Sequence, residues 1–100
     1  MNVDRDKVLD ALRKKRDHIE QEYGMRMIGI VGSVARGEAT PESDVDVFVD
    51  IIGTPTLFEI AGAEIELQDD AGIGLPVDFV FREDLRPALR ARMERDLILL

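Results

Sequence analysis

The sequence predicts an α/β or α+β fold, with elements in the order helix, strand, strand, helix, strand, helix. Short apolar or alternating runs at residues 27–31, 44–49 and 76–81 indicate three strands, and amphipathic or capped stretches between them indicate three helices. The 100 residues contain no repeat, no low-complexity segment and no linker rich in Pro, Gly or Ser. This length and continuity predict a single domain over residues 1–100.

Each predicted helix has a recognisable start or stop. The first is expected over 4–22, with Tyr23-Gly24 ending it. A second helix should follow Thr56, which stands in capping-box spacing with Glu59 ahead of an apolar run. A proline opens the last helix, expected over 87–96. The apolar face of the first helix is made up of Val8, Leu9, Leu12 and Ile19.

The predicted strands differ in how their apolar residues are arranged. The stretch Met27–Val31 is almost wholly apolar and reads as a buried strand, whereas the later two alternate. The apolar tail Leu97–Leu100 must dock on its own sheet or against another chain; its own sheet is favoured, and a partner surface stays open. The core-facing side chains of the alternating strands are expected to be Val45, Val47, Val49, Val77, Phe79 and Phe81.

A glycine and a serine directly follow the first strand. The residues after Gly32-Ser33 can turn into a short helix, whose first backbone N–H groups are free to bind an anion. Gly32 lets the backbone approach a phosphate with no Cβ in the way, and the Ser33 hydroxyl adds a donor. An ordinary strand-to-helix turn would look similar, so the phosphate interpretation depends on the carboxylates that come next.

Two aspartates lie two residues apart on the second strand. Asp44 and Asp46 should share one face, with Cβ atoms roughly 7 Å apart. At that separation both carboxylates can bind one Mg²⁺ or divide between two, and magnesium typically takes one or two protein carboxylates together with water and substrate phosphate. The competing interpretation makes Asp44 a turn residue beside Ser43 and Asp46 a solvated strand residue.

A third carboxylate is expected from the last strand. Asp78 points away from the apolar face of residues 76–81, where an unpaired carboxylate is unfavourable. A metal ion would be a suitable partner, and a site with two metals needs a further carboxylate of this kind. An exposed strand position remains the alternative. Asp50 lies on the Asp46 face but at the end of its strand, so a structural or solvated role is favoured for it.

Composition limits the possible functions. The chain has 21 acidic and 13 basic residues and a net charge of −8, which argues against a nucleic-acid partner because phosphate backbones require a basic surface. The absence of cysteine excludes disulfides and thiolate zinc sites. No run approaches the roughly 18 apolar residues of a membrane span, and no signal-peptide pattern is present. A cytoplasmic protein without membrane contact is expected.

Four short motifs together resemble the signature of the DNA polymerase beta-like nucleotidyltransferase superfamily. They are Gly32-Ser33, Arg36-Gly37, Ser43-Asp44-x-Asp46 and Val77-Asp78-Phe79. Within that superfamily the chain resembles, over nearly all its length, the minimal nucleotidyltransferases that act as antitoxins beside HEPN-domain toxins. The resemblance implies a small mixed-sheet palm flanked by helices, ATP and one or two Mg²⁺ ions, and transfer of AMP to a tyrosine of the partner toxin.

The resemblance also implies a set of site residues. Asp44, Asp46 and Asp78 would be the catalytic and metal-binding residues. Arg36 is equally well explained as a helix-surface arginine. Two other functions stay open: a non-catalytic antitoxin that blocks its partner by binding, and a nucleotidyltransferase acting on a small molecule, although such relatives carry an extra helical region for which 100 residues leave no room. The nucleotide-binding residues would be Gly32, Ser33, Arg36 and Ser43.

Overall fold

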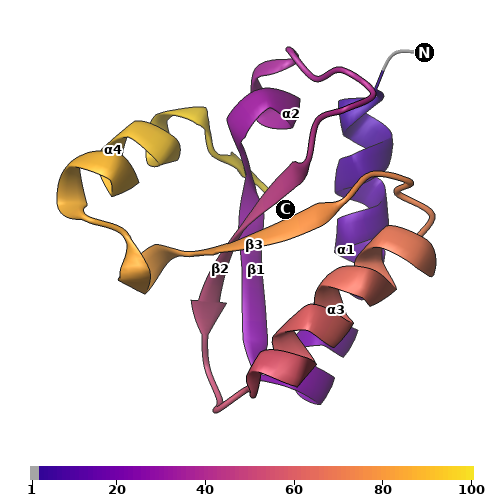
Figure 1. Cartoon of the computed structure of the whole chain (residues 1–100), viewed down its shortest axis with the longest axis vertical. Helices are drawn as coiled ribbons and strands as arrows, with labels where there is room; N and C mark the ends of the chain where they lie inside the picture. The colour runs from indigo at the N-terminus through magenta and orange to yellow at the C-terminus, as the bar shows by residue number, and fades with distance from the viewer. Residues whose placement is uncertain (1–2) are drawn as a thin grey trace.

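The computed structural model describes residues 3–100, which form a four-stranded mixed sheet with helices against it (Figure 1). The predicted mixed α/β fold is therefore confirmed. None of the helices in this part of the chain is long and apolar enough to cross a bilayer. The elements follow in the order α1 (Arg5–Tyr23), β1 (Met25–Val31), α2 (Gly32–Arg36), β2 (Val45–Ile51), α3 (Leu57–Asp69), β3 (Val77–Phe81), the 3₁₀ turn η1 (Arg82–Asp84), α4 (Pro87–Asp96) and β4 (Ile98–Leu99).

The sheet has the strand order β3-β2-β1-β4. β1 runs antiparallel to both of its neighbours, β2 and β4, whereas β2 and β3 run parallel and are joined through α3. A parallel pair needs such a crossover, because the chain must return to the end of the sheet at which the first strand began before the second strand can run in the same direction. The parallel pair matters for function, since it carries two of the predicted aspartates.

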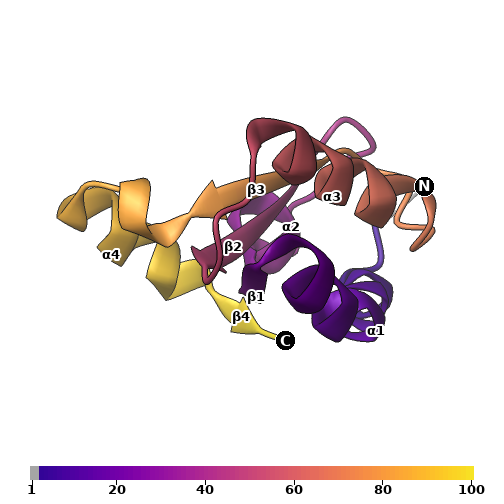
Figure 2. The ribbon, with the colours of Figure 1, turned by 90° about the horizontal axis from the view of Figure 1, so that it is seen from below.

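The core lies between the sheet and the pair of helices α1 and α3, while α4 stands on the opposite side of the sheet (Figure 2). Val45, Val47 and Val49 are completely buried in it, as their alternation along β2 predicts. The four apolar residues predicted for the face of α1 are buried as well. The polar face of β2 is thereby directed away from α1 and α3.

The two long helices on the core face begin with side-chain caps, and the cap of α3 is the predicted one. The Asp4 carboxylate accepts hydrogen bonds from the backbone N–H groups of Asp6 and Lys7 at the start of α1. Thr56 and Glu59 form the predicted capping box at the start of α3, each accepting a hydrogen bond from the other's backbone N–H. Local capping therefore fixes where both helices begin.

The apolar tail forms a strand that the predicted element order did not contain. Ile98 and Leu99 pair with Ile30 and Gly29 as the short edge strand β4, so the tail docks on its own sheet, which was the favoured alternative. Gly29 makes this approach possible, because a Cβ there would lie 2.1 Å from the carbonyl oxygen of Ile98. The missing side chain of one residue in β1 thus admits the last strand.

Gly29→Ala is expected to push β4 off the sheet. An added methyl group in a well-packed contact typically lowers the free energy of unfolding by about 1–3 kcal/mol. The N–H of Leu100, which donates to the Ile28 carbonyl at 3.1 Å, should then lose its protection from amide hydrogen exchange. Gly62→Ala is the control, because nothing lies within 4 Å of a Cβ at Gly62. Unchanged protection of Leu100 in the Gly29 variant would contradict the close contact.

Candidate active site

Two of the three predicted aspartates are direct neighbours across the parallel strands. Asp46 of β2 is in register with Asp78 of β3. Residues in register on adjacent strands project to the same side of a sheet, and here it is the side opposite α1 and α3. Asp78 is exposed and Asp46 is half-buried. Asp44, also exposed, directly precedes β2. The alternation of both strands therefore brings the carboxylates of Asp46 and Asp78 to one face.

The glycine turn adjoins the same carboxylates. Val31, the last residue of β1, is paired with Asp46, and Gly32 follows it with φ +78°, a backbone conformation that favours glycine. A Cβ at Gly32 would lie 2.5 Å from Oδ2 of Asp46. The turn and the carboxylate are thus in contact, and only a residue without a side chain fits between them. A phosphate bound at the turn would lie beside Asp46.

Helix α2 is a single short turn of chain that is fixed at its C-terminal end. Arg5 of α1 donates a hydrogen bond from Nη1 to the carbonyl oxygen of Ala35 at 2.7 Å. Gly37, with φ +74°, ends the helix, and its N–H donates to the carbonyl of Val34 at 3.1 Å. The N-terminal end has no side-chain cap. The first N–H groups of α2 are therefore not taken up by a capping side chain.

The ionised form of the Asp46 carboxyl group is disfavoured by its surroundings. Burial, and then the charges of Asp78 and Asp44, raise the pKa of Asp46, while Arg36 acts in the opposite direction. Within residues 3–100 no group of three or more carboxylate, imidazole or thiol side chains is arranged to hold a metal ion, so the structure brings Asp46 and Asp78 together but does not gather Asp44 with them into such a group. Magnesium does not need one, since it completes its coordination with water and substrate phosphate. The carboxylates and the glycine cradle fit a divalent cation with a bound phosphate.

Two residues predicted to bind nucleotide have protein partners in the structure. Arg36 forms ion pairs with Glu38 at 2.9 Å and with Asp96 of α4 at 3.0 Å. The Ser43 hydroxyl accepts a hydrogen bond from the N–H of Thr40 at 2.9 Å and so closes the turn before β2. The nucleotide-binding roles of Arg36 and Ser43 stay predictions.

Asp50, the rival carboxylate on β2, is used elsewhere. It accepts hydrogen bonds from the Arg82 guanidinium, one from Nε at 3.0 Å and a second from Nη2. This charge-assisted, two-point contact with Arg82 engages both oxygens of the Asp50 carboxylate. This geometry agrees with the structural role favoured for Asp50 on its position at the end of the strand.

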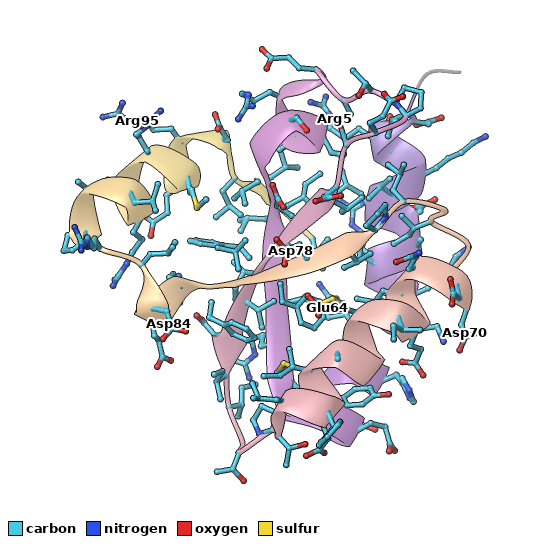
Figure 3. The ribbon with its side chains drawn as sticks, in the orientation of Figure 1. Arg5, Glu64, Asp70, Asp78, Asp84 and Arg95 are labelled. Atoms are coloured by element: carbon cyan, nitrogen blue, oxygen red, sulfur yellow. The ribbon has the colours of Figure 1, made fainter. Side chains whose placement is uncertain are left out.

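Glu64 adjoins the site but was not among the predicted residues. From α3 its Oε2 accepts a hydrogen bond from the backbone N–H of Phe79 at 2.8 Å, and Figure 3 shows it near Asp78. Burial, and to a smaller degree the charge of Asp78, raise the pKa of Glu64, while the bond from Phe79 lowers it. Glu64 thereby holds the edge strand that carries Asp78. Sequence spacing offers no signal for this contact, because Glu64 is one of several acidic residues on α3.

Comparison with known proteins identifies the class. Residues 12–100 match the nucleotidyltransferase domain, and the chain belongs to this family. Members of the family generally use a nucleoside triphosphate and a divalent metal. More particularly, protein adenylyltransferase MntA of Thermococcus cleftensis is 34% identical over 91 residues, which are 91% of this chain and 87% of the relative. The chain is thus a nucleotidyltransferase enzyme similar to protein adenylyltransferases.

Solved structures agree with this assignment. A minimal nucleotidyltransferase is 34% identical, has a TM-score of 0.70, and is matched over 92% of this chain and 95% of its own. The predicted nucleotidyltransferase fold and the predicted family are both confirmed by this similarity. A crystal structure of a toxin–antitoxin with AMP-PNP has a TM-score of 0.57 and 20% identity, covering 86% of this chain and 63% of that one. At that identity it supports the fold alone.

Proposed function

We propose that this chain transfers AMP from ATP, with Mg²⁺, to a tyrosine hydroxyl of a HEPN-type toxin and thereby acts as its antitoxin. The observation that carries the proposal is the register of Asp46 with Asp78 beside the Gly32 turn. The similarity to protein adenylyltransferases supports a protein acceptor. The crystal structure of a toxin–antitoxin with AMP-PNP is consistent with a toxin partner and a triphosphate, although both were observed with that protein.

The residues of the site divide the work. Gly32 and Ser33 would bind the β- and γ-phosphates, Asp44 and Asp46 would hold the Mg²⁺, and Asp78 would serve as the general base or bind a second metal ion. Bound Mg²⁺ supplies charge neutralisation for the triphosphate and the leaving pyrophosphate. Gly32 leaves the space next to Asp46 open for a phosphate oxygen.

The chemical step is a single displacement at the α-phosphorus. The tyrosine oxygen forms a bond to phosphorus, and the bond from that phosphorus to the oxygen of the β-phosphate breaks, releasing pyrophosphate. The phenolic proton passes to Asp78, which is exposed and can be reached by an acceptor from outside.

Intact-mass analysis of the toxin tests this function. Incubation of the toxin with the chain, ATP and Mg²⁺ is expected to add one adenylyl mass or a multiple, and fragmentation should place it on a tyrosine. A variant with alanine at Asp44, Asp46 and Asp78 is the matched control and should leave the mass unchanged. The proposal fails if the toxin keeps its mass with every nucleoside triphosphate, or if the triple variant neutralises it equally well without modification.

A further inference from the structure

A small cleft separates α2 from α4 on the side of the sheet that carries the aspartates. Its volume is about 210 Å³, below the roughly 300–1,000 Å³ of pockets that enclose a whole drug-sized ligand. It has room for one ring system and is open to solvent beyond it. The residues that line it are Gly32, Arg36, Leu89, Arg92, Met93 and Asp96.

The α4 wall of this cleft is one face of the helix. Leu89, Arg92, Met93 and Asp96 are spaced by three and four residues, so their side chains lie along one stripe. No residue of α4 is fully buried, and Leu89 leaves 42% of its surface exposed. Leu89 and Met93, one turn apart, therefore present an uncovered apolar surface toward α2, and methionine adapts readily to flat ligands.

Two arginines, Arg36 and Arg92, and one carboxylate, Asp96, line the same cleft. Arg36 on the α2 side is bound to Asp96 at 3.0 Å, which ties α4 to α2. Arg92 on the α4 side has no carboxylate within ion-pair distance among residues 3–100. The chain as a whole carries a net charge of −8, so an arginine without a carboxylate partner is one of its few groups suited to bind an anionic ligand.

Gly32 connects the cleft to the carboxylates. It lines the cleft and it also contacts Asp46, so a ligand whose phosphates lie on the Gly32 turn reaches both places. We propose that α4 forms the wall of the nucleotide site: Arg92 donates to the phosphates, and Leu89 and Met93 cover the base. This inference rests on the nucleotide site proposed above, and it assigns to α4 a part in choosing the substrate.

Binding measurements on Arg92→Ala test the phosphate contact. Isothermal titration calorimetry with Mg·ATP and with Mg·tripolyphosphate should show affinities about tenfold weaker for both ligands, as expected for the loss of one charge-assisted hydrogen bond. Arg95→Ala is the matched control, since it removes the same charge from an exposed position of α4 outside the cleft (Figure 3). Equal affinities of the Arg92 and Arg95 variants would overturn this contact.

The double variant Leu89→Ala, Met93→Ala tests the base contact. It should weaken Mg·ATP several-fold and leave Mg·tripolyphosphate unchanged, because tripolyphosphate has no base. Leu57→Ala on α3, where Leu57 is 83% exposed, is the apolar control. An unchanged ATP affinity, or no binding of ATP by the wild-type chain, would overturn the inference. AMP transfer to the toxin is a separate measurement. If the variants change ATP and tripolyphosphate affinity as expected but no AMP is transferred to the toxin, the proposed acceptor is wrong and the proposed role of α4 in nucleotide binding is retained.

Discussion

Asp46→Asn is expected to reduce AMP transfer by about a thousandfold or more, because metal ligation supplies several kcal/mol of transition-state stabilisation and each 1.36 kcal/mol corresponds to a factor of ten. The amide has the same shape as the carboxylate, so its contact with Gly32 is kept. Only the negative charge that binds the cation is lost. Quantifying adenylylated toxin over time by intact mass gives the rate, and transfer at the wild-type rate would contradict the metal-binding role.

The same variant should not be less stable than the wild type at neutral pH. Burial and the neighbouring aspartates raise the pKa of Asp46 above its ordinary value of 3.8, so the ionised carboxylate disfavours the folded state at higher pH. Asparagine removes that unfavourable contribution. The stability difference in favour of the variant should shrink as the pH falls through the raised pKa, and vanish below 3.8. Urea unfolding at neutral and acidic pH measures it.

Asp50→Asn is the matched control on the same strand. Asp50 is bound to Arg82 and takes no part in the proposed chemistry, so transfer should stay near the wild-type rate. Its partly exposed ion pair contributes up to about 1 kcal/mol, and the variant should lose that stability. The two substitutions therefore separate the roles of two aspartates on one face of β2: one is expected to cost activity, and the other stability.

Gly32→Ala is expected to reduce both activity and stability. The φ of +78° and a Cβ placed 2.5 Å from Oδ2 of Asp46 require either the turn or the carboxylate to move. A strained non-glycine residue costs about 1–3 kcal/mol. The carboxylate is the more mobile of the two, so it should rotate out of the site and reduce AMP transfer by about a hundredfold.

Gly62→Ala provides the control for that experiment. Gly62 lies within α3, has no positive φ, and has nothing within 4 Å of an added Cβ. Alanine inside a helix is more stable than glycine by about 0.5–1 kcal/mol, so this variant should gain stability and keep its activity. Thermal unfolding and the mass assay give both readouts. A Gly32 variant that behaved like the Gly62 variant would show that the turn and Asp46 are not in close contact.

Patterns within short stretches of sequence predicted the features of the fold and site that depend on residues close together in the chain. The alternation along β2 and β3 was enough to place Asp46 and Asp78 away from the core, and the resemblance of the motifs indicated that both belong to one site. The capping box of Thr56 and Glu59 located the start of α3 in the same way. These features are determined within a few residues of chain, so the sequence alone contains them.

Features that depend on which elements meet were not predictable. Phe48 lies between Asp46 and Asp50 on the side expected to be polar, yet it is fully buried. The Arg36–Asp96 ion pair joins residues sixty positions apart, and nothing near either residue identifies the other. Glu64 is a comparable case on α3. All three features depend on tertiary packing between distant segments, which cannot be predicted from the periodicity of a single segment.

The edge strand β4 has a consequence for how the protein is made. β1 emerges early from the ribosome, but its outer edge pairs with Ile98 and Leu99 and accepts a hydrogen bond from the N–H of Leu100, all of which are made much later. Until those residues are translated, the open edge of β1 can pair with other nascent polypeptides.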